Sequence, residues 1–361
     1  MDLFSPEVPF DQWHQNFKMI WMQRNPWNEC VLAEWALNFT DRDDKFVKEF
    51  QTTFNSSFWE LYLFACLKEM RFAVDFSHTA PDFVARRGDE HICIEAAIAS
   101  NPDGYQAEWE GDVESRVAEH IDRRSIVERT IPRLTNTLVS KHRKFMKQYS
   151  TLPHVKDRAF IVAIAPFDQP MSFYQTDQAI RNVLYQYDLP IYQDIPEENR
   201  RIIFGHEYLE YILKPNGSKI ELGFFLDDRM KEISAVIFSN VATWGKVRAL
   251  SSDPNRNILF ESQRYNDAGL KAHHRLQKKA DYRETLLDGL HVLLNPHAQV
   301  PIPPAMLNWP RVAYHTLDSD DGVPVEESPD GFLFWRTVLT LPPEADVDEY
   351  VKKANENIKS S

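Results

Sequence analysis

The sequence predicts an α/β fold whose core is a mixed four-stranded sheet flanked by helices. An apolar helical stretch at 53–70 precedes three short strand signals between residues 72 and 99. A stretch with helical spacing at 131–149 then precedes a continuous apolar run at 159–167. Strand and helix patterns that alternate in this way are typical of a sheet with helices on its faces. We therefore expect the order helix, strand, strand, strand, helix, strand.

The first helix is predicted from the letters TFNSSFWELYLFACLKEM at 53–70. Asn55, Ser56 and Ser57 are candidates for its N-cap, because their side chains can accept a backbone N–H group at a helix start. Apolar residues surround nearly the whole helix, which predicts burial on most sides. Glu60 is an acidic residue in this apolar setting.

Three strands are predicted from FAVDF (72–76), DFVARR (82–87) and HICIEAAIA (91–99). The polar turn GDE at 88–90 joins the last two strands into a hairpin. The run AFIVAIAPF at 159–167 is apolar throughout, as a central strand that is buried on both faces would be.

Beyond residue 170 the periodic signals are weaker. We predict a helix near 173–186, strands around KIELGFFL (219–226) and ISAVIFSN (233–240), a helix near 282–293, a strand at FLFWRTVLTL (332–341) and a polar helix at the end. The chain then divides into a helical lead-in (1–52), the core (53–170), an α+β extension packed on the core (171–300), and a Pro-rich segment with a late strand and a polar tail (301–361).

The composition indicates a folded globular protein, because 361 residues with 43% hydrophobic content can bury a large core. The first residues, MDLFSPEVPFDQW, lack the basic and apolar regions of a secretory signal, and no run approaches the ~20 apolar residues that span a bilayer. We therefore expect a cytoplasmic protein with no membrane partner. The formal net charge of −13 restricts any contact with nucleic acid to local basic patches.

Several common chemistries lack a starting motif. The sequence has no Walker loop, no GxGxxG and no GxSxG, which argues against ATP hydrolysis, dinucleotide binding and α/β-hydrolase chemistry. Three cysteines, none in a CxxC pair, give neither zinc spacing nor a disulfide framework. The neighbours His273 and His274 are expected to point apart, and His206-Glu207 lacks the second histidine of HExxH, so no histidine metal site is predicted.

Glu95 is an acidic residue in the middle of an otherwise apolar strand. Period-2 alternation places Ile92 and Ile94 on one face of that strand and Cys93, Glu95 and Ala97 on the other. Burying an ionised carboxylate there is unfavourable unless a cation or hydrogen-bond donors meet it. We therefore expect a specific partner for Glu95.

Two further acids are candidates for the same cluster. Asp82 follows Pro81 at the start of the neighbouring strand, and Glu60 lies on the preceding apolar helix. Carboxylates that lie close together repel one another and stay protonated in the absence of a metal ion. Their oxygens are the ligands that Mg²⁺ prefers, and a bound Mg²⁺ assists phosphodiester hydrolysis by activating water and stabilising the developing charge.

These residues resemble the motif of the PD-(D/E)XK, or restriction-endonuclease-like, nuclease superfamily. The resemblance rests on Glu60, on the Pro81-Asp82 dipeptide and on Glu95, and it covers roughly residues 53–167 in the element order of that superfamily's core. It implies a restriction-endonuclease-like core and a metal-dependent nuclease that hydrolyses phosphodiester bonds. It further implies Mg²⁺, or Mn²⁺ in its place, bound by Asp82 and Glu95, with Glu60 supporting the site.

The chain departs from that motif at the lysine, which would stand two residues after Glu95, where this sequence has Ala97. Some members of the superfamily carry the lysine on the following helix. Lys141 on the helix at 131–149 fits this arrangement, because it flanks the apolar stripe. The resemblance then implies that Lys141 positions or deprotonates the attacking water, with Lys144 as the reserve candidate.

Nucleic acid is the expected partner, with DNA as the expected substrate, in DNA processing or in defence against foreign DNA. Arg133 and Lys144 are expected to contact phosphates, since both belong to the basic part of the same helix. A homodimer stays open, because two strands need two sites. Longer strings also resemble a group of uncharacterised bacterial proteins placed near these nucleases: FNSSFWELYLF (54–64), LPHVKDRAFIVAIAPF (152–167), SAVIFSN (234–240) and NPHA (295–298).

Less specific interpretations of the same residues stay open. Glu95 could form a structural salt bridge with Arg86 or Arg87, and Lys141 could be a surface lysine whose stem packs on the core. The chain would then be a catalytically inactive nuclease fold that serves as a binding or scaffolding protein, which Ala97 permits. The acidic net charge also suits a protein partner. A nuclease predicts that the three acids and Lys141 converge; an inactive fold predicts acids paired with arginines.

Overall fold

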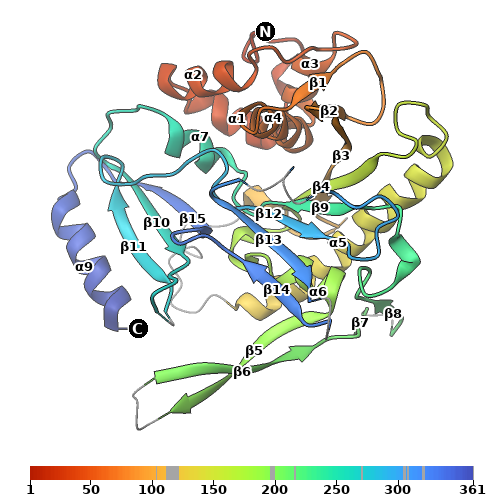
Figure 1. Cartoon of the computed structure of the whole chain (residues 1–361). Coiled ribbons are helices and arrows are strands. Elements are labelled where there is room, and N and C mark those ends of the chain that lie inside the picture. Colours follow the sequence, from red (N-terminus) through yellow and green to blue (C-terminus); the bar gives the residue numbers. More distant parts are fainter. Residues whose placement is uncertain are drawn as a thin grey trace.

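The backbone of the computed structural model is built around a mixed eight-stranded sheet with helices on both faces (Figure 1). The structure describes residues 1–102, 104–110, 122–195, 200–214, 217–269, 271–303, 306, 309–318 and 322–360. Part of the Pro-rich segment expected in 301–361 therefore lies outside the described residues. Within these ranges, none of the helices has the length and hydropathy that crossing a bilayer demands.

Helices occupy most of the first 70 residues, and strands predominate beyond them. The α-helices are α1 (Gln15–Met22), α2 (Pro26–Trp35), α3 (Phe46–Thr52), α4 (Phe54–Glu69), α5 (Arg123–Lys144), α6 (Gln178–Tyr185), α7 (Trp244–Leu250) and α9 (Val347–Ser360). The strands are β1 (Ala73–Asp75), β2 (Phe83–Arg87), β3 (Glu90–Ser100), β4 (Ala159–Phe167), β5 (Tyr187–Ile195), β6 (Arg200–Tyr208), β7 (Tyr211–Leu213), β8 (Lys219–Glu221), β9 (Ala235–Phe238), β10 (Ile258–Arg264), β11 (His273–Lys278), β12 (Leu290–Leu294), β13 (Val312–Leu317), β14 (Pro324–Glu327) and β15 (Leu333–Thr340). Short 3₁₀ turns lie at Phe10–Gln12, Glu108–Glu110, Ser172–Gln175 and Asp228–Met230, and a π-helical turn at Phe145–Tyr149 ends α5.

The large sheet has the strand order β1-β2-β3-β4-β9-β12-β13-β14. The pairs β3–β4, β4–β9 and β12–β13 are parallel, and the other neighbours are antiparallel. The predicted class, α/β with a mixed sheet and flanking helices, is confirmed, and so is the order helix, strand, strand, strand, helix, strand from α4 to β4. The expected number of four strands is wrong. The C-terminal half adds β9, β12, β13 and β14 beyond β4, whose apolar edge would otherwise be open to pairing with other chains.

Two apolar cores lie on the two faces of this sheet. Ile92, Ile94 and Ile161 pack with helices α1 to α4, whereas Cys93 and Val162 pack with α5 and α6. The alternation predicted for β3 is therefore confirmed, and Glu95 lies on the face that α5 covers. All nine residues of β4 are buried, as its continuous apolar run predicts.

Helix α4 is the buried helix that the sequence predicts, with its apolar residues enclosed on nearly all sides. The indole of Trp59 donates to the carbonyl of Ala163 on β4 at 3.1 Å. The hydroxyl of Tyr62 donates to the carbonyl of Leu286 at 2.9 Å. The predicted N-cap is wrong, because the helix begins at Phe54 directly after α3, and Thr53 stands at the cap without a side-chain hydrogen bond.

The C-terminal half adds a second sheet, β11-β10-β15, beside the large one. Helix α9, the polar terminal helix that the sequence predicts, packs its apolar residues against this sheet (Figure 1). The hairpin β5–β6 extends away from the body of the molecule (Figure 1). The strands expected at 219–226 and 233–240 are present but shorter.

The helix expected near 282–293 is wrong: the chain there is a loop followed by strand β12 (Leu290–Leu294). Gly289 ends the loop with φ of +79°, and a β-carbon at this position would meet the side chain of Val241. Glycine takes that left-handed conformation without steric strain. The apolar run that follows pairs with β9 and β13 in the middle of the sheet, because pairing removes its backbone from water.

A buried ion-pair network joins the two sheets. Lys246 on α7 is fully buried, and its Nζ lies 2.5 Å from Oε1 of Glu284 and donates to the carbonyl of Asp288 at 2.7 Å. The other oxygen of Glu284 accepts from Nε of Arg336 on β15 at 2.9 Å. Charges that are fully enclosed in this way stay stable only as a set, since removal of one leaves another buried without its partner.

We predict that Lys246→Met destabilises the protein by about 3–5 kcal/mol in urea unfolding, because it leaves a buried carboxylate without one of its cations. The control is Lys353→Met, which breaks the exposed pair between Lys353 and Glu349 on α9. An exposed pair contributes about 0–1 kcal/mol, so the control should change little. Equal effects of the two substitutions would show that the buried network does not hold the sheets together.

Candidate active site

Glu95 has two cationic partners. It lies on β3 and is 1% exposed. Its Oε1 accepts from Nζ of Lys141 at 2.7 Å and from Nζ of Lys144 at 2.8 Å. A buried carboxylate needs a cation or hydrogen-bond donors, and Glu95 has two lysines from the helix that covers the same face of the sheet.

The end of α5 brings both lysines to one oxygen. Residues three apart share one side of a helix, so Lys141 and Lys144 point to the same place. The π-helical turn Phe145–Tyr149 follows directly, and the ammonium of Lys144 lies 5.0 Å from the ring centroid of Tyr149. Burial of Phe145 and Tyr149 anchors this end of the helix against the sheet.

Asp82 lies beside Glu95 because of the register of β2 and β3. Phe83, the first residue of β2, pairs with Ile94, so Asp82 stands next to Glu95 where the hydrogen bonding of the two strands ends. Its Oδ2 accepts the backbone N–H of Ala96 at 2.7 Å. Burial and the nearby charge of Glu95 raise the pKa of Asp82.

The pKa of Glu95 is lowered: burial opposes this, but the charges and hydrogen bonds of Lys141 and Lys144 outweigh it. The two neighbouring acids therefore have pKa values that are pushed apart. Glu95 is the ionised member of the pair, and Asp82 is the one that holds its proton more tightly. A pair of carboxylates with divergent pKa values in one site is typical of acid–base chemistry.

Glu60 on α4 is the third acid. Burial raises its pKa to about 8, and the charges of Asp82 and Glu95 act in the same direction, while Arg42 opposes them. Glu60 is thus near enough to both acids to be affected by their charges, and it is protonated at neutral pH. The charges of Asp82 and Glu95 thus reach Glu60, and Lys141 lies against Glu95.

Beyond Asp82, strand β3 has an edge that pairs with no strand of the described residues, and side chains of α5 cover it. The hydroxyl of Thr137 donates to the carbonyl of Ile98 at 3.4 Å, and Nε of Arg133 donates to the carbonyl of Ser100 at 3.0 Å. Side chains therefore satisfy backbone groups that a further strand would satisfy elsewhere in the sheet.

A pocket of about 450 Å³ opens along this edge, next to the acids. It lies between β3 and α5 and reaches Ser56 at the start of α4. A second hollow of about 410 Å³ continues along α5 and shares Asn136 and Ser140 with the first. The walls of the two carry cationic and amide side chains at helical spacing: Arg133, Asn136, Lys141, Arg143, Lys144, Lys147 and Gln148.

The carboxylate oxygens of this site are suitable ligands for a divalent cation such as Mg²⁺. Oε2 of Glu95 is buried and accepts no hydrogen bond from the described residues, and such an oxygen beside Asp82 is the ligand type that Mg²⁺ prefers. The oxygens of the three acids nevertheless do not all lie close enough together to bind one ion. Among the described residues, the only group of three potential ligands within 4.8 Å of one another is Asp177, His291 and His315.

The other expected partners of Glu95 lie elsewhere. Arg86 pairs across the hairpin with His91, and Arg87 stacks on the rings of Phe72 and Trp309, with its guanidinium carbon 5.0 and 5.1 Å from the ring centroids. The structural salt bridge that the sequence left open between Glu95 and these arginines is therefore absent.

Sequence reasoning missed the polar residues of α5 that line the pocket, such as Asn136, Thr137 and Ser140. Their signal was present, because they recur at helical spacing with Arg133 and Lys141. It also missed Arg42, whose charge acts on Glu60 from the loop between α2 and α3.

Comparison with protein-family models, with curated proteins and with solved structures found no match in any of the three.

We predict that Glu60→Gln stabilises the protein at pH 8 by on the order of 3 kcal/mol and has little effect near pH 4. Folded Glu60 keeps its proton up to about pH 8, whereas the unfolded chain loses it above its ordinary pKa of 4.5. Wild-type stability therefore falls as pH rises between these values, and glutamine removes that dependence. Urea unfolding at both pH values measures it. An equal effect at both would show that Glu60 is ionised in the fold.

Proposed function

We propose that the chain is a metal-dependent nuclease of the PD-(D/E)XK type that hydrolyses phosphodiester bonds in DNA. The observation that carries the proposal is the buried carboxylate of Glu95, held by Lys141 and Lys144 beside Asp82. Lys141 and the neighbouring Ala96 also line a pocket along the basic face of α5. Metal-assisted phosphodiester cleavage uses oxygen ligands for the metal ion, a cationic side chain beside the attacking water, and a surface that binds phosphate. The acids, the lysines and the basic face of α5 correspond to these three components.

The arrangement of elements supports this assignment. The sequence α4-β1-β2-β3-α5-β4 has the element order of the restriction-endonuclease-like core, with the acids at the point where β2 and β3 part. Lys141 from α5 reaches the carboxylate that the motif lysine would accompany from position 97. Ala97 leaves room for it, because its side chain lines the same pocket and fills little of it.

Asp82 and Glu95 would hold Mg²⁺, and Glu60 would support them from α4. When bound, Mg²⁺ would supply Lewis-acid stabilisation of the charge that develops on the phosphate. Lys141 has three N–H donors and can orient a water molecule in the pocket, or donate to a phosphate oxygen. Lys144, held against Tyr149, keeps positive charge at the site when Lys141 moves away from Glu95.

The basic face of α5 supports a nucleic-acid substrate. Arg143 and Lys147 are exposed and continue the line of Arg133 and Lys141 along the helix. The positive charge of this face suits the sugar–phosphate backbone. Because the chain has a net charge of −13, we expect nucleic acid to contact this basic face and not the rest of the surface. A helix of this length presents side chains over several phosphates.

An inactive nuclease fold is the second candidate, and one observation favours it. Two lysines already neutralise Glu95, so the carboxylate needs no metal ion to be stable in the fold. The protein would then bind nucleic acid or another protein with this face and cut nothing.

We predict that Mg²⁺ or Mn²⁺ binds the wild type in calorimetry, and that Asp82→Asn and Glu95→Gln abolish binding and reduce plasmid nicking by at least about 100-fold. The matched control is Asp168→Asn, which alters a buried acid outside the site that accepts from Thr130 at 2.7 Å. This control should keep both activities. Metal binding should also strengthen as pH rises, since it displaces the proton of Asp82.

A folded wild type that binds no metal and nicks no plasmid would overturn the nuclease and leave the inactive fold. Metal binding that survives both substitutions would place the metal elsewhere. Thermal unfolding of each variant separates loss of function from loss of fold.

We predict that Arg143→Ala and Lys147→Ala each weaken the binding of a fluorescent DNA duplex and reduce the slope of log Kd against log salt concentration by about 1. The physical reason is that each side chain releases counterions on meeting a phosphate. Lys352→Ala, on α9, is the control and should leave the slope unchanged. Unaltered slopes for the α5 variants would show that nucleic acid does not bind this face.

A further inference from the structure

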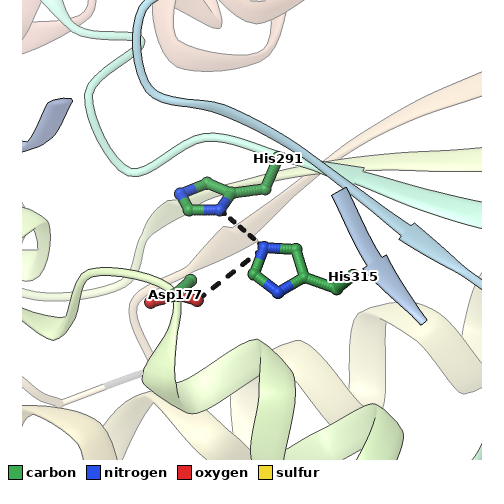
Figure 2. Close-up of side chains that lie close together, drawn as sticks. All are labelled: Asp177, His291 and His315. Atoms are coloured by element: carbon green, nitrogen blue, oxygen red, sulfur yellow. Dashed lines mark hydrogen bonds and ion pairs between the residues drawn. The ribbon is translucent and has the colours of Figure 1, made fainter. Parts of the chain in front are cut away.

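Two buried histidines and an aspartate form a second cluster, separate from the acids of the candidate active site (Figure 2). His291 lies on β12, His315 lies on the neighbouring strand β13, and Asp177 immediately precedes α6. Their side chains point toward one another (Figure 2). The register explains the convergence: Leu293 pairs with His315, so both imidazoles lie on the face of the sheet that α6 covers.

The spacing of the ligand atoms suits one tetrahedral ion. Nδ1 of His291 lies 3.0 Å from Nε2 of His315, which lies 3.9 Å from Oδ2 of Asp177. Two ligands at the usual distance from Zn²⁺ are about 3.3 Å apart, between these two values. The separation between Oδ2 of Asp177 and Nε2 of His315 is too long for a hydrogen bond.

The donor set selects the class of metal. Imidazole nitrogens bind Zn²⁺ and similar transition metals, whereas Mg²⁺ prefers oxygen ligands alone. We infer that Asp177, His291 and His315 form a structural zinc site, with a water molecule in the fourth position. The role is structural because the three residues are between 0% and 4% exposed, which leaves no path for a substrate.

Groups around the cluster fit this assignment. Arg181 lies 3.0 Å through its Nε from the same Oδ2 of Asp177 and 3.1 Å through its Nη1 from Oε2 of Glu326 on β14, and so holds the aspartate in position. Metal ligands are commonly held by such outer contacts. An ion here would join the start of α6 to β12 and β13, the strands that extend the sheet beyond the nuclease-like core.

A simpler arrangement of the same residues is a hydrogen bond between the two imidazoles beside the ion pair of Asp177 with Arg181. The hydrogen-bonded cluster contains no metal and the zinc site contains one ion, so the decisive measurement is the metal content of the protein. We expect the full-length wild type, purified without chelator or added metal, to contain one equivalent of zinc by mass spectrometry. Replacing zinc by Co²⁺ should give the visible absorption of a tetrahedral site.

His315→Gln should lose that equivalent of zinc and the Co²⁺ absorption. Two controls should retain them: Glu95→Gln, in the candidate active site, and His274→Gln, which removes a histidine paired with Glu261 at 2.8 Å outside the cluster. A zinc chelator should lower the Tm of the wild type by several degrees and leave the Tm of His315→Gln unchanged.

A folded wild type with no zinc that also fails to bind added Zn²⁺ or Co²⁺ would overturn the zinc site, and this outcome does not depend on whether any variant folds. Zinc that persists in His315→Gln would show that another group binds it. Neither outcome bears on the nuclease, because that proposal rests on Mg²⁺ binding by different residues. Conversely, loss of nicking in Glu95→Gln with zinc retained would separate the two sites.

Discussion

An ionised carboxylate inside an apolar sheet is the constraint on which the candidate site depends. Glu95 lies where burial would strongly favour its neutral form, and the fold keeps it charged by delivering two ammonium groups to one of its oxygens. That requirement determines the position of the end of α5. The helix must lie over the face of β3 that carries Glu95, with residues 141 and 144 turned inward, and the anchored turn at Phe145–Tyr149 holds it there. The pocket along β3 follows from the same arrangement.

The three acids respond differently to one low-dielectric setting. Glu95 has cations within hydrogen-bond distance and is ionised, Asp82 has a backbone N–H and a raised pKa, and Glu60 has only a more distant arginine and stays protonated. A cluster in this state stores unfavourable electrostatic energy that a divalent cation would relieve. Unfavourable electrostatic energy of this kind is more typical of a functional site than of a structural salt bridge, in which each charge has a partner of opposite sign. The matched network of Lys246, Glu284 and Arg336 shows the contrast within the same chain.

The C-terminal half has a clear structural role. It continues the sheet past β4 through four more strands and attaches a second sheet through buried ion pairs. Without it, the edge of β4 would lie open. It also brings histidines of two neighbouring strands against the start of α6. Strands β1 to β4 are thus one end of a larger sheet, and the acids lie toward the end farthest from the C-terminal strands.

The sequence by itself determined the α/β class, the order of elements from α4 to β4 and the face of β3 on which Glu95 lies, whereas Lys141 was expected from the family resemblance. These features follow from local patterns: alternation sets the face of a strand, and helical spacing sets the side of a helix. Strand pairing beyond β4, the packing of Gly289 against Val241, the convergence of both lysines on one oxygen of Glu95, and the meeting of Asp177 with His291 and His315 were decided by the tertiary structure alone. Each of them joins residues far apart in the chain, and no local period encodes which distant strand or loop will lie beside a given side chain.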